Sequence, residues 1–186
     1  KIAVSFPKAI TAKPVPKKDY IDLLKSFYEL FLIVQRDGLL AIEKHIEKPE
    51  ESEILSANKK FLSNKIALTF FCDTLKVMLS GGVPPHEIEA LMDTEIETYE
   101  SEVKPISGLL GKVADALPGL GIVAAVLGII VTMASIDKGA AEVGKHVAAA
   151  LVGTFLGVLL SYGFVNPLAT NLERVYDDEI SYLTTI

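Results

Sequence analysis

Residues 116–136 read ALPGLGIVAAVLGIIVTMASI, a stretch of 21 residues without Asp, Glu, Lys or Arg. A helix of this length spans about 31 Å, which matches the ~30 Å hydrocarbon core of a bilayer. A second uncharged stretch, residues 146–172, has 27 residues and is long enough for a tilted span. Only residues 137–145 separate the two stretches. The sequence therefore predicts an antiparallel pair of transmembrane helices.

The rest of the chain is rich in charge. The 186 residues have a mean hydropathy of +0.39, yet 23% of them are charged. Residues 1–115 hold 15 of the 18 Lys and Arg and 18 of the 24 Asp and Glu. We therefore expect two zones, one facing water and one compatible with lipid.

Apolar spacing predicts that the charged zone is helical. From Tyr20 the apolar residues follow the helical period until Gly38 interrupts it, and residues 61–79 form a second apolar helix that ends at Ser80-Gly81-Gly82. Residues 87–102 carry seven acids and no base. We interpret them as a solvated helix face, with a docking surface for a basic partner as the alternative. The predicted fold class is an all-α membrane protein, a helix hairpin plus a helical domain.

Small residues recur every four positions on both predicted spans. The residues are Ala124, Gly128 and Thr132 on the first span and Ala149, Gly153, Gly157 and Ser161 on the second. Such rows let helix backbones approach closely in lipid. We expect Gly128, Gly153 and Gly157 to be helix-packing positions. Rows on both spans further predict neighbours beyond the hairpin, such as sister subunits.

Several function classes are excluded. The single cysteine, Cys72, allows neither an internal disulfide nor a cysteine metal cage. A net charge of −6 without a basic patch argues against nucleic acid. The three histidines fit no metal-ligand motif, and no phosphate-binding or nucleophile-elbow motif is present. Ser161 and His146 lie about 22 Å apart along one helix, too far for a catalytic pair. We expect neither an enzyme nor a cofactor.

Ion transport by these spans alone is difficult. A proton path normally needs an ionisable residue inside the membrane, and the spans offer hydroxyls and, at one edge, His146. Either a carboxylate comes from another subunit or the protein is a non-energised scaffold. Pro118 begins one span and Pro167 lies late in the other, on the same side of the membrane. The two prolines either mark the ends of helices or act as a hinge between the membrane hairpin and the charged domain.

The spans resemble a known family. LPGLGIVAAVLG at 117–128 resembles the third transmembrane segment of the MotA family of flagellar motor stator subunits, and ALVGTFLG at 150–157, continuing to Pro167-Leu168-Ala169, resembles the fourth. Residues 51–54 and 87–93 also resemble that family's cytoplasmic loop. The similarity extends from about Tyr20 to Thr170.

The resemblance implies a topology. Residues 1–115 would form a cytoplasmic domain, and two further spans would precede it. Residues 116–136 and 146–172 would be the membrane helices, and residues 137–145 would form a short periplasmic loop between them. Residues 173–186 would be the start of a cytoplasmic tail. The protein would be a homopentamer in the bacterial inner membrane, embedded in lipid around a dimer of a MotB-like single-span subunit. The aspartate of that subunit would carry the proton, and the cytoplasmic domain would push the rotor switch protein.

The resemblance also assigns residues. Pro118 and Pro167 match the family's two functional prolines, and Glu43 matches its loop glutamate. Arg36 matches its loop arginine, although Gln35 stands at the ungapped position. Arg36 and Glu43 are seven residues apart, so they would share one exposed helix face if Gly38 does not break the helix.

The choice of ion is predicted from the pathway residues Ala125 and Thr154. Sodium-driven relatives carry threonine where this chain has Ala125, opposite the threonine matched by Thr154. Because Ala125 supplies no side-chain oxygen, one ligand for sodium is missing, and we expect proton coupling. A TolQ- or ExbB-like energiser of an outer-membrane system is the alternative within the superfamily.

Overall fold

The computed structural model describes residues 7, 9–11 and 14–186. Residues 1–6, 8, 12 and 13 of the predicted cytoplasmic domain lie outside the described residues. The described part contains helices, turns and no strand, which confirms the all-α prediction. The chain divides into two compact units. The first comprises Lys1–Ala12 and Glu102–Val175, and the second comprises Lys13–Ser101 and Tyr176–Ile186.

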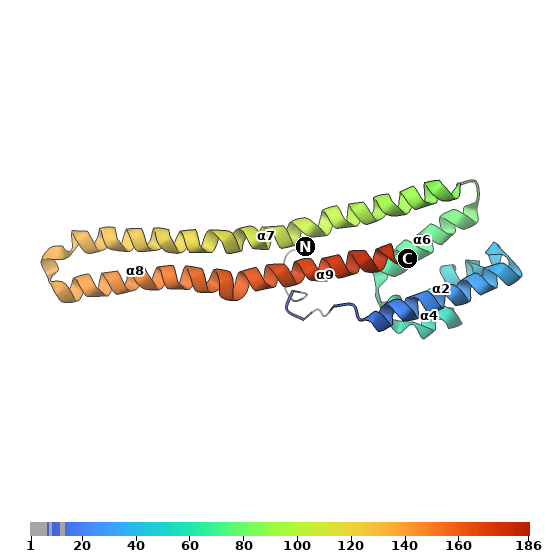
Figure 1. Cartoon of the computed structure of the whole chain (residues 1–186), viewed down its shortest axis with the longest axis horizontal. Helices are drawn as coiled ribbons and strands as arrows, with labels where there is room; N and C mark the ends of the chain where they lie inside the picture. The colour runs from blue at the N-terminus through green and yellow to red at the C-terminus, as the bar shows by residue number, and fades with distance from the viewer. Residues whose placement is uncertain (1–6, 8, 12–13) are drawn as a thin grey trace. The chain divides into compact units, whose positions relative to one another are not determined.

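The first unit is an antiparallel hairpin, as predicted. Its arms are the last part of α7 (Pro85–Ala134) and the continuous run of α8 (Ala140–Leu160), η4 (Ser161–Val165) and the beginning of α9 (Asn166–Thr184). The turn contains η3 (Ile136–Lys138) and Gly139. Gly139 has a φ of 93° and lies between the end of η3 and the beginning of α8. Figure 1 shows α7 and α8 side by side along the hairpin.

Helix α7 is longer than the sequence patterns predict. The acidic stretch 87–102 and the uncharged stretch 116–136 are one helix of 50 residues, which begins at Pro85 and includes Pro105 and Pro118. Our expectation that Pro118 lies in the first turn of its helix is therefore wrong. Proline in a helix interior removes one hydrogen bond but does not have to end the helix when neighbouring segments hold it.

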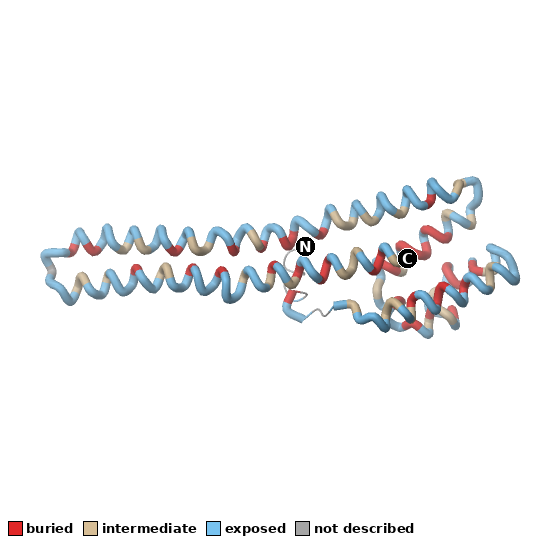
Figure 2. Tube along the Cα trace, in the orientation of Figure 1, coloured by how far each residue is buried: buried red, intermediate tan, exposed pale blue. Residues whose placement is uncertain are grey.

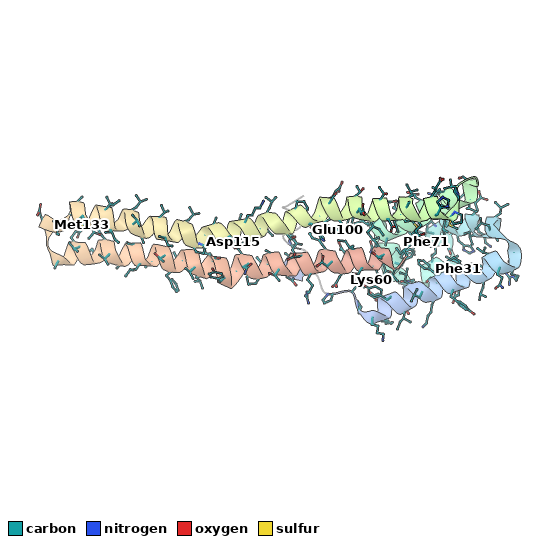
Figure 3. All side chains as sticks on the ribbon, turned by 45° about the horizontal axis from the view of Figure 1, so that its top comes forward. Phe31, Lys60, Phe71, Glu100, Asp115 and Met133 are labelled. Atoms are coloured by element: carbon teal, nitrogen blue, oxygen red, sulfur yellow. The ribbon has the colours of Figure 1, made fainter. Side chains whose placement is uncertain are left out.

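The hairpin presents apolar side chains outward. Each of its two helical runs includes an 18-residue stretch that is long and apolar enough to cross a membrane, and only 11% of each stretch is buried. Buried residues lie on the facing sides of the two arms (Figure 2), and carbon-rich side chains project outward near Met133 (Figure 3). Burying such a surface in lipid avoids the large cost of exposing it to water. The arrangement favours a membrane hairpin.

The second unit is a small helical domain. Its elements before α7 are α2 (Lys17–Asp37), η1 (Leu39–Ile42), α3 (Glu43–Glu47), η2 (Pro49–Glu51), α4 (Glu53–Ala57), α5 (Lys59–Ser63) and α6 (Lys65–Ser80). Phe27 and Phe71 stack with ring centroids 4.6 Å apart, and Phe61 packs edge-on against both. This aromatic cluster is the centre of a core that also includes Tyr182 and Leu183 from α9.

Helix ends in this domain follow local chemistry. Gly38 ends α2 with a φ of 89°, and Gly81 and Gly82 follow α6 with φ of 71° and 82°, which confirms both predicted stops. The predicted helix at 61–79 is divided into α5 and α6 at Asn64. The Asn64 side chain accepts a hydrogen bond from the amide of Ala67 and so caps a new helix.

His45 makes the stability of this domain depend on pH. Its ring is buried, its Nδ1 lies 2.8 Å from Ser52 Oγ, and its Nε2 has no partner. Burial, with a smaller effect of Lys44, lowers the pKa of His45. The unfolded chain therefore binds this proton more readily than the folded one, and stability falls as the pH drops below about 6.5. We expect thermal unfolding of the intact protein, followed by circular dichroism, to shift down between pH 7.5 and 5.5.

Two variants test the assignment to His45. His45→Gln, which does not titrate, should weaken this pH dependence, whereas His86→Gln, at an exposed position, should retain it. Identical pH profiles for the wild type and His45→Gln would contradict the prediction.

Candidate functional site: the seam of the membrane hairpin

The facing sides of the two hairpin arms form one continuous contact, which we call the seam. Its residues are Ala114, Leu117, Gly121, Ala124 and Gly128 on α7, Ser135 directly after the end of α7, and His146, Ala150, Gly153, Thr154, Gly157 and Ser161 on the other arm. The pairs run antiparallel, from Ala114 with Ser161 at one end to Ser135 with His146 at the other.

The three predicted packing glycines all lie in the seam. A Cβ added to Gly157 would lie 2.6 Å from the carbonyl oxygen of Leu117, and one added to Gly153 would lie 3.1 Å from Ala124 Cβ. A Cβ on Gly128 would overlap the Cβ of Ala150. These glycines therefore let the two arms of one hairpin approach each other, rather than leaving an open face for a sister subunit.

Gly121 is a seam residue that the sequence patterns missed. It is buried, and an added Cβ would lie 3.1 Å from the carbonyl oxygen of Gly153 and from Thr154 Cα. Gly121 and Gly128 are spaced by seven residues, two helical turns on one face. This spacing indicates that Gly121 and Gly128 face the same way, but the four-residue row beginning at Ala124 does not include Gly121.

The two predicted pathway residues, Thr154 and Ala125, are both close to Gly121. Thr154 is half-buried, and its hydroxyl donates to the carbonyl oxygen of Gly121 at 3.2 Å. Ala125, also half-buried, follows Gly121 by one helical turn. Because the Thr154 hydroxyl proton is used in this bond, the oxygen of Thr154 offers only its lone pairs to another group.

The two prolines lie at the same end of the hairpin. Pro118 is half-buried in α7, one turn after Ala114, and Pro167 is an exposed residue at the start of α9. The buried hydroxyl of Ser161 donates to the carbonyl oxygen of Ala114 at 2.6 Å. Ser161 is also the first residue of η4, a π-helical turn that ends directly before Asn166 and Pro167.

The turn end of the seam has a polar contact of its own. Ser135 Oγ lies 2.9 Å from His146 Nδ1, and His146 Nε2 lies 3.8 Å from Glu142. The Ser135 hydroxyl also lies 3.1 Å from the carbonyl oxygens of Val131 and Thr132. The arrangement ties the two arms together beside the loop. The sequence patterns missed this Ser135–His146 pair because it depends on the helix register across the turn.

The two predicted rotor residues do not share one helix. Arg36 lies in the last turn of α2 and Glu43 begins α3, with Gly38 and η1 between them. Arg36 and Glu43 therefore do not share one helical face, because Gly38, with its positive φ, ends α2 between them. Both residues are exposed, and Arg36 forms a 2.7 Å ion pair with Asp37. This contact raises the pKa of Arg36 and lowers that of Asp37.

A family model matches residues 58–185 of the chain, that of the MotA/TolQ/ExbB proton channel family. The match includes both arms of the hairpin and the whole seam. It covers more than half of the chain.

Curated relatives are similar over most of this chain. Motility protein A of Salmonella typhimurium is 47% identical over 158 residues, which are 85% of this chain and 54% of the relative. Motility protein A of Escherichia coli is 46% identical over the same number of residues, with the same shares of the two chains. Chemotaxis protein LafT of Vibrio parahaemolyticus is 40% identical over 155 residues, 83% of this chain and 54% of LafT. The chain thus spans about half the length of these relatives.

Two solved structures share the fold. The MotAB structure of C. jejuni matches with a TM-score of 0.76 at 19% identity, covering 98% of this chain and 63% of that chain. The flagellar MotAB stator complex of Bacillus subtilis matches with a TM-score of 0.75 at 24% identity, covering 100% of this chain and 68% of that chain.

Proposed function

Because this chain belongs to the MotA/TolQ/ExbB proton channel family, we propose that it is the core of a stator subunit of a bacterial flagellar motor. The observation that carries the proposal is the 47% identity to a motility protein A over 85% of the chain. This similarity includes residues beyond the generic apolar pattern of a membrane span. We accordingly propose ion transport coupled to torque, rather than catalysis.

The chemistry of the seam supports a partner that supplies the proton carrier. Both arms offer hydroxyls and carbonyls, and the described seam contains one ionisable side chain, His146, at its turn end. A hydroxyl can line a proton path but does not ionise at neutral pH. We propose that a dimer of a MotB-like single-span subunit contributes a membrane carboxylate, and that five copies of this protein surround it in the inner membrane.

The same residues support protons as the coupling ion. Thr154 offers lone pairs near Gly121, while Ala125 adds no side-chain oxygen. Sodium would require several oxygen ligands to replace its hydration, whereas a proton needs only the carboxylate and a polar path.

Motility tests both the function and the ion. The intact protein, expressed with its partner in cells that lack their own stator, should restore swimming that stops on addition of a proton uncoupler. Removing external sodium should leave the swimming speed unchanged. Sodium-dependent swimming that resists the uncoupler would contradict proton coupling. Failure to restore any swimming, with the partner co-purifying normally, would contradict the stator assignment and favour a TolQ- or ExbB-like energiser.

We propose that Arg36 and Glu43 contact the rotor switch protein through their charges. Both are exposed on the second unit, and Arg36 is oriented by Asp37. Neutralising either residue should have a mild effect, because exposed ion pairs are weak. Reversing either charge should reduce swimming more, since like charges then face each other. Swimming speed at low ionic strength measures the difference.

The control reversal is Glu29→Lys, an exposed position on the same helix as Arg36. It should leave the swimming speed close to that of the wild type. If the double variant Arg36→Glu and Glu43→Lys swims normally at low salt, the two residues are solvated surface and the rotor contact lies elsewhere.

A further inference from the structure

Pro118 leaves one carbonyl of α7 without its helical donor. In an α-helix the amide of each residue bonds the carbonyl four positions earlier, and proline has no amide hydrogen. The carbonyl that Pro118 would otherwise have bonded belongs to Ala114, which is 1% exposed. A buried acceptor without a donor is costly, so another group is needed to satisfy it.

Ser161 of the other arm supplies that donor. Its hydroxyl lies 2.6 Å from the Ala114 oxygen, and Ser161 itself is only 1% exposed. The close approach depends on Gly157, one turn earlier, because a Cβ there would collide with the carbonyl of Leu117. A serine in a helix commonly bonds a carbonyl of its own preceding turn. Here the hydroxyl instead reaches across the seam to the carbonyl opposite it.

Ser161 also lies at a change in its own helix. It begins the π-helical turn η4, in which the amide of Asn166 bonds the carbonyl of Ser161 five positions earlier. This wider turn runs directly into Pro167, the second proline of the hairpin. Single π-helical turns inside α-helices are local irregularities and commonly mark functional positions. One residue thus lies between the carbonyl freed by Pro118 and the irregular turn that precedes Pro167.

We propose that Ser161 is a positioning residue that replaces the donor missing at Pro118 and joins the two proline-containing segments into one unit. When α7 bends at Pro118, the bond to Ala114 carries the start of η4 with it. The bond itself follows from the geometry of this chain. Its part in coupling ion flow to motion rests on the proposed function.

A double-mutant cycle tests the bond independently of motility. We measure the thermal unfolding midpoint of the purified intact protein with its partner for the wild type, Ser161→Ala, Pro118→Ala and the double variant. Ser161→Ala should lower the midpoint by several degrees when Pro118 is present. In the Pro118→Ala background its effect should be much smaller, because the new amide at position 118 satisfies Ala114.

Two further variants separate the hydrogen bond from packing. Ser161→Cys has a similar size and a weak donor, so it should lose stability only when Pro118 is present. Ser135→Ala, at the other buried serine of the seam, should have the same effect with either residue at position 118. Equal losses for Ser161→Ala in both backgrounds, or full stability of Ser161→Cys beside Pro118, would overturn the proposal.

Motility then tests the positioning role. If the wild type restores swimming, Ser161→Ala and Ser161→Cys should both reduce it at normal membrane levels, and full swimming by both would overturn the positioning role. If the wild type restores no swimming, the proposed function fails, while the stability cycle still decides whether Ser161 replaces the missing donor.

Discussion

Gly157→Leu is expected to prevent the two arms of the hairpin from packing together. Any side chain at this position starts 2.6 Å from the carbonyl oxygen of Leu117 and 3.1 Å from Gly121 Cα. Both neighbours are backbone, so no side-chain rotation can relieve the contact and the helices must separate. Helix association in lipid depends on such close packing. The loss of the seam should remove assembly with the partner and all swimming.

The matched control for this variant is Gly144→Leu. Gly144 lies on the same helix, α8, and an added Cβ there meets nothing within 4 Å in this chain. We expect native mass spectrometry in mild detergent to show the assembled complex for Gly144→Leu, and only unassembled subunits for Gly157→Leu. If both variants assemble equally well, the tight contact at Gly157 does not limit hairpin formation.

The rows of small residues pack the two arms of one hairpin against each other. Their spacing alone predicts close approach but does not say between which helices. The structure shows that Gly128, Gly153 and Gly157 all face the opposite arm of the same hairpin. Contacts between copies of the protein within the membrane are therefore expected to use the outward apolar side chains. The expected loss of assembly in Gly157→Leu begins inside one subunit.

Features set by local chemistry could be predicted from the sequence. The absence of charge in two long stretches predicted the hairpin, and glycines with positive φ ended α2 and α6 where expected. Prolines predicted the ends of helices less reliably. Pro49 and Pro85 lie at the start of a helix, whereas Pro118 lies inside one. The packed surroundings decide between these outcomes.

Features set by the register between helices could not be predicted. The bond from Ser161 to Ala114 joins residues 47 positions apart, and the contact of Ser135 with His146 spans the loop. Each depends on the phase of one helix against the other, which a single periodic pattern leaves open. The spacing of Arg36 and Glu43 suggested a shared helical face, but Gly38 ends α2 between them, so the two residues lie on different helices.

Replacing Pro118 by alanine is expected to stabilise the helix and strongly impair function. Alanine restores the amide that bonds the Ala114 carbonyl, and proline in a helix interior is about 3 kcal/mol less favourable than alanine. The variant helix α7 should insert normally into the membrane. Since the proposed motion bends the hairpin at this level, we expect swimming to fall at least tenfold. Pro167→Ala should act in the same direction, because it restores a regular helical donor directly after η4.

Pro105→Ala is the matched control, because Pro105 also lies inside α7 but outside the seam. It should gain helix stability in the same way and still swim. This result would separate a general effect of helix stabilisation from a specific effect at the hairpin end. Membrane levels by immunoblot and swimming speed by tracking measure the two properties. Normal swimming of Pro118→Ala and Pro167→Ala at wild-type levels would contradict the proposal that these prolines form a hinge.

Loss of swimming in Pro105→Ala as well would indicate that function depends on prolines along the whole of α7, and not only on those at the end of the hairpin. Because all three variants restore a backbone donor, loss of swimming in Pro118→Ala and Pro167→Ala alone would place the functional requirement at the end of the hairpin where these two prolines lie.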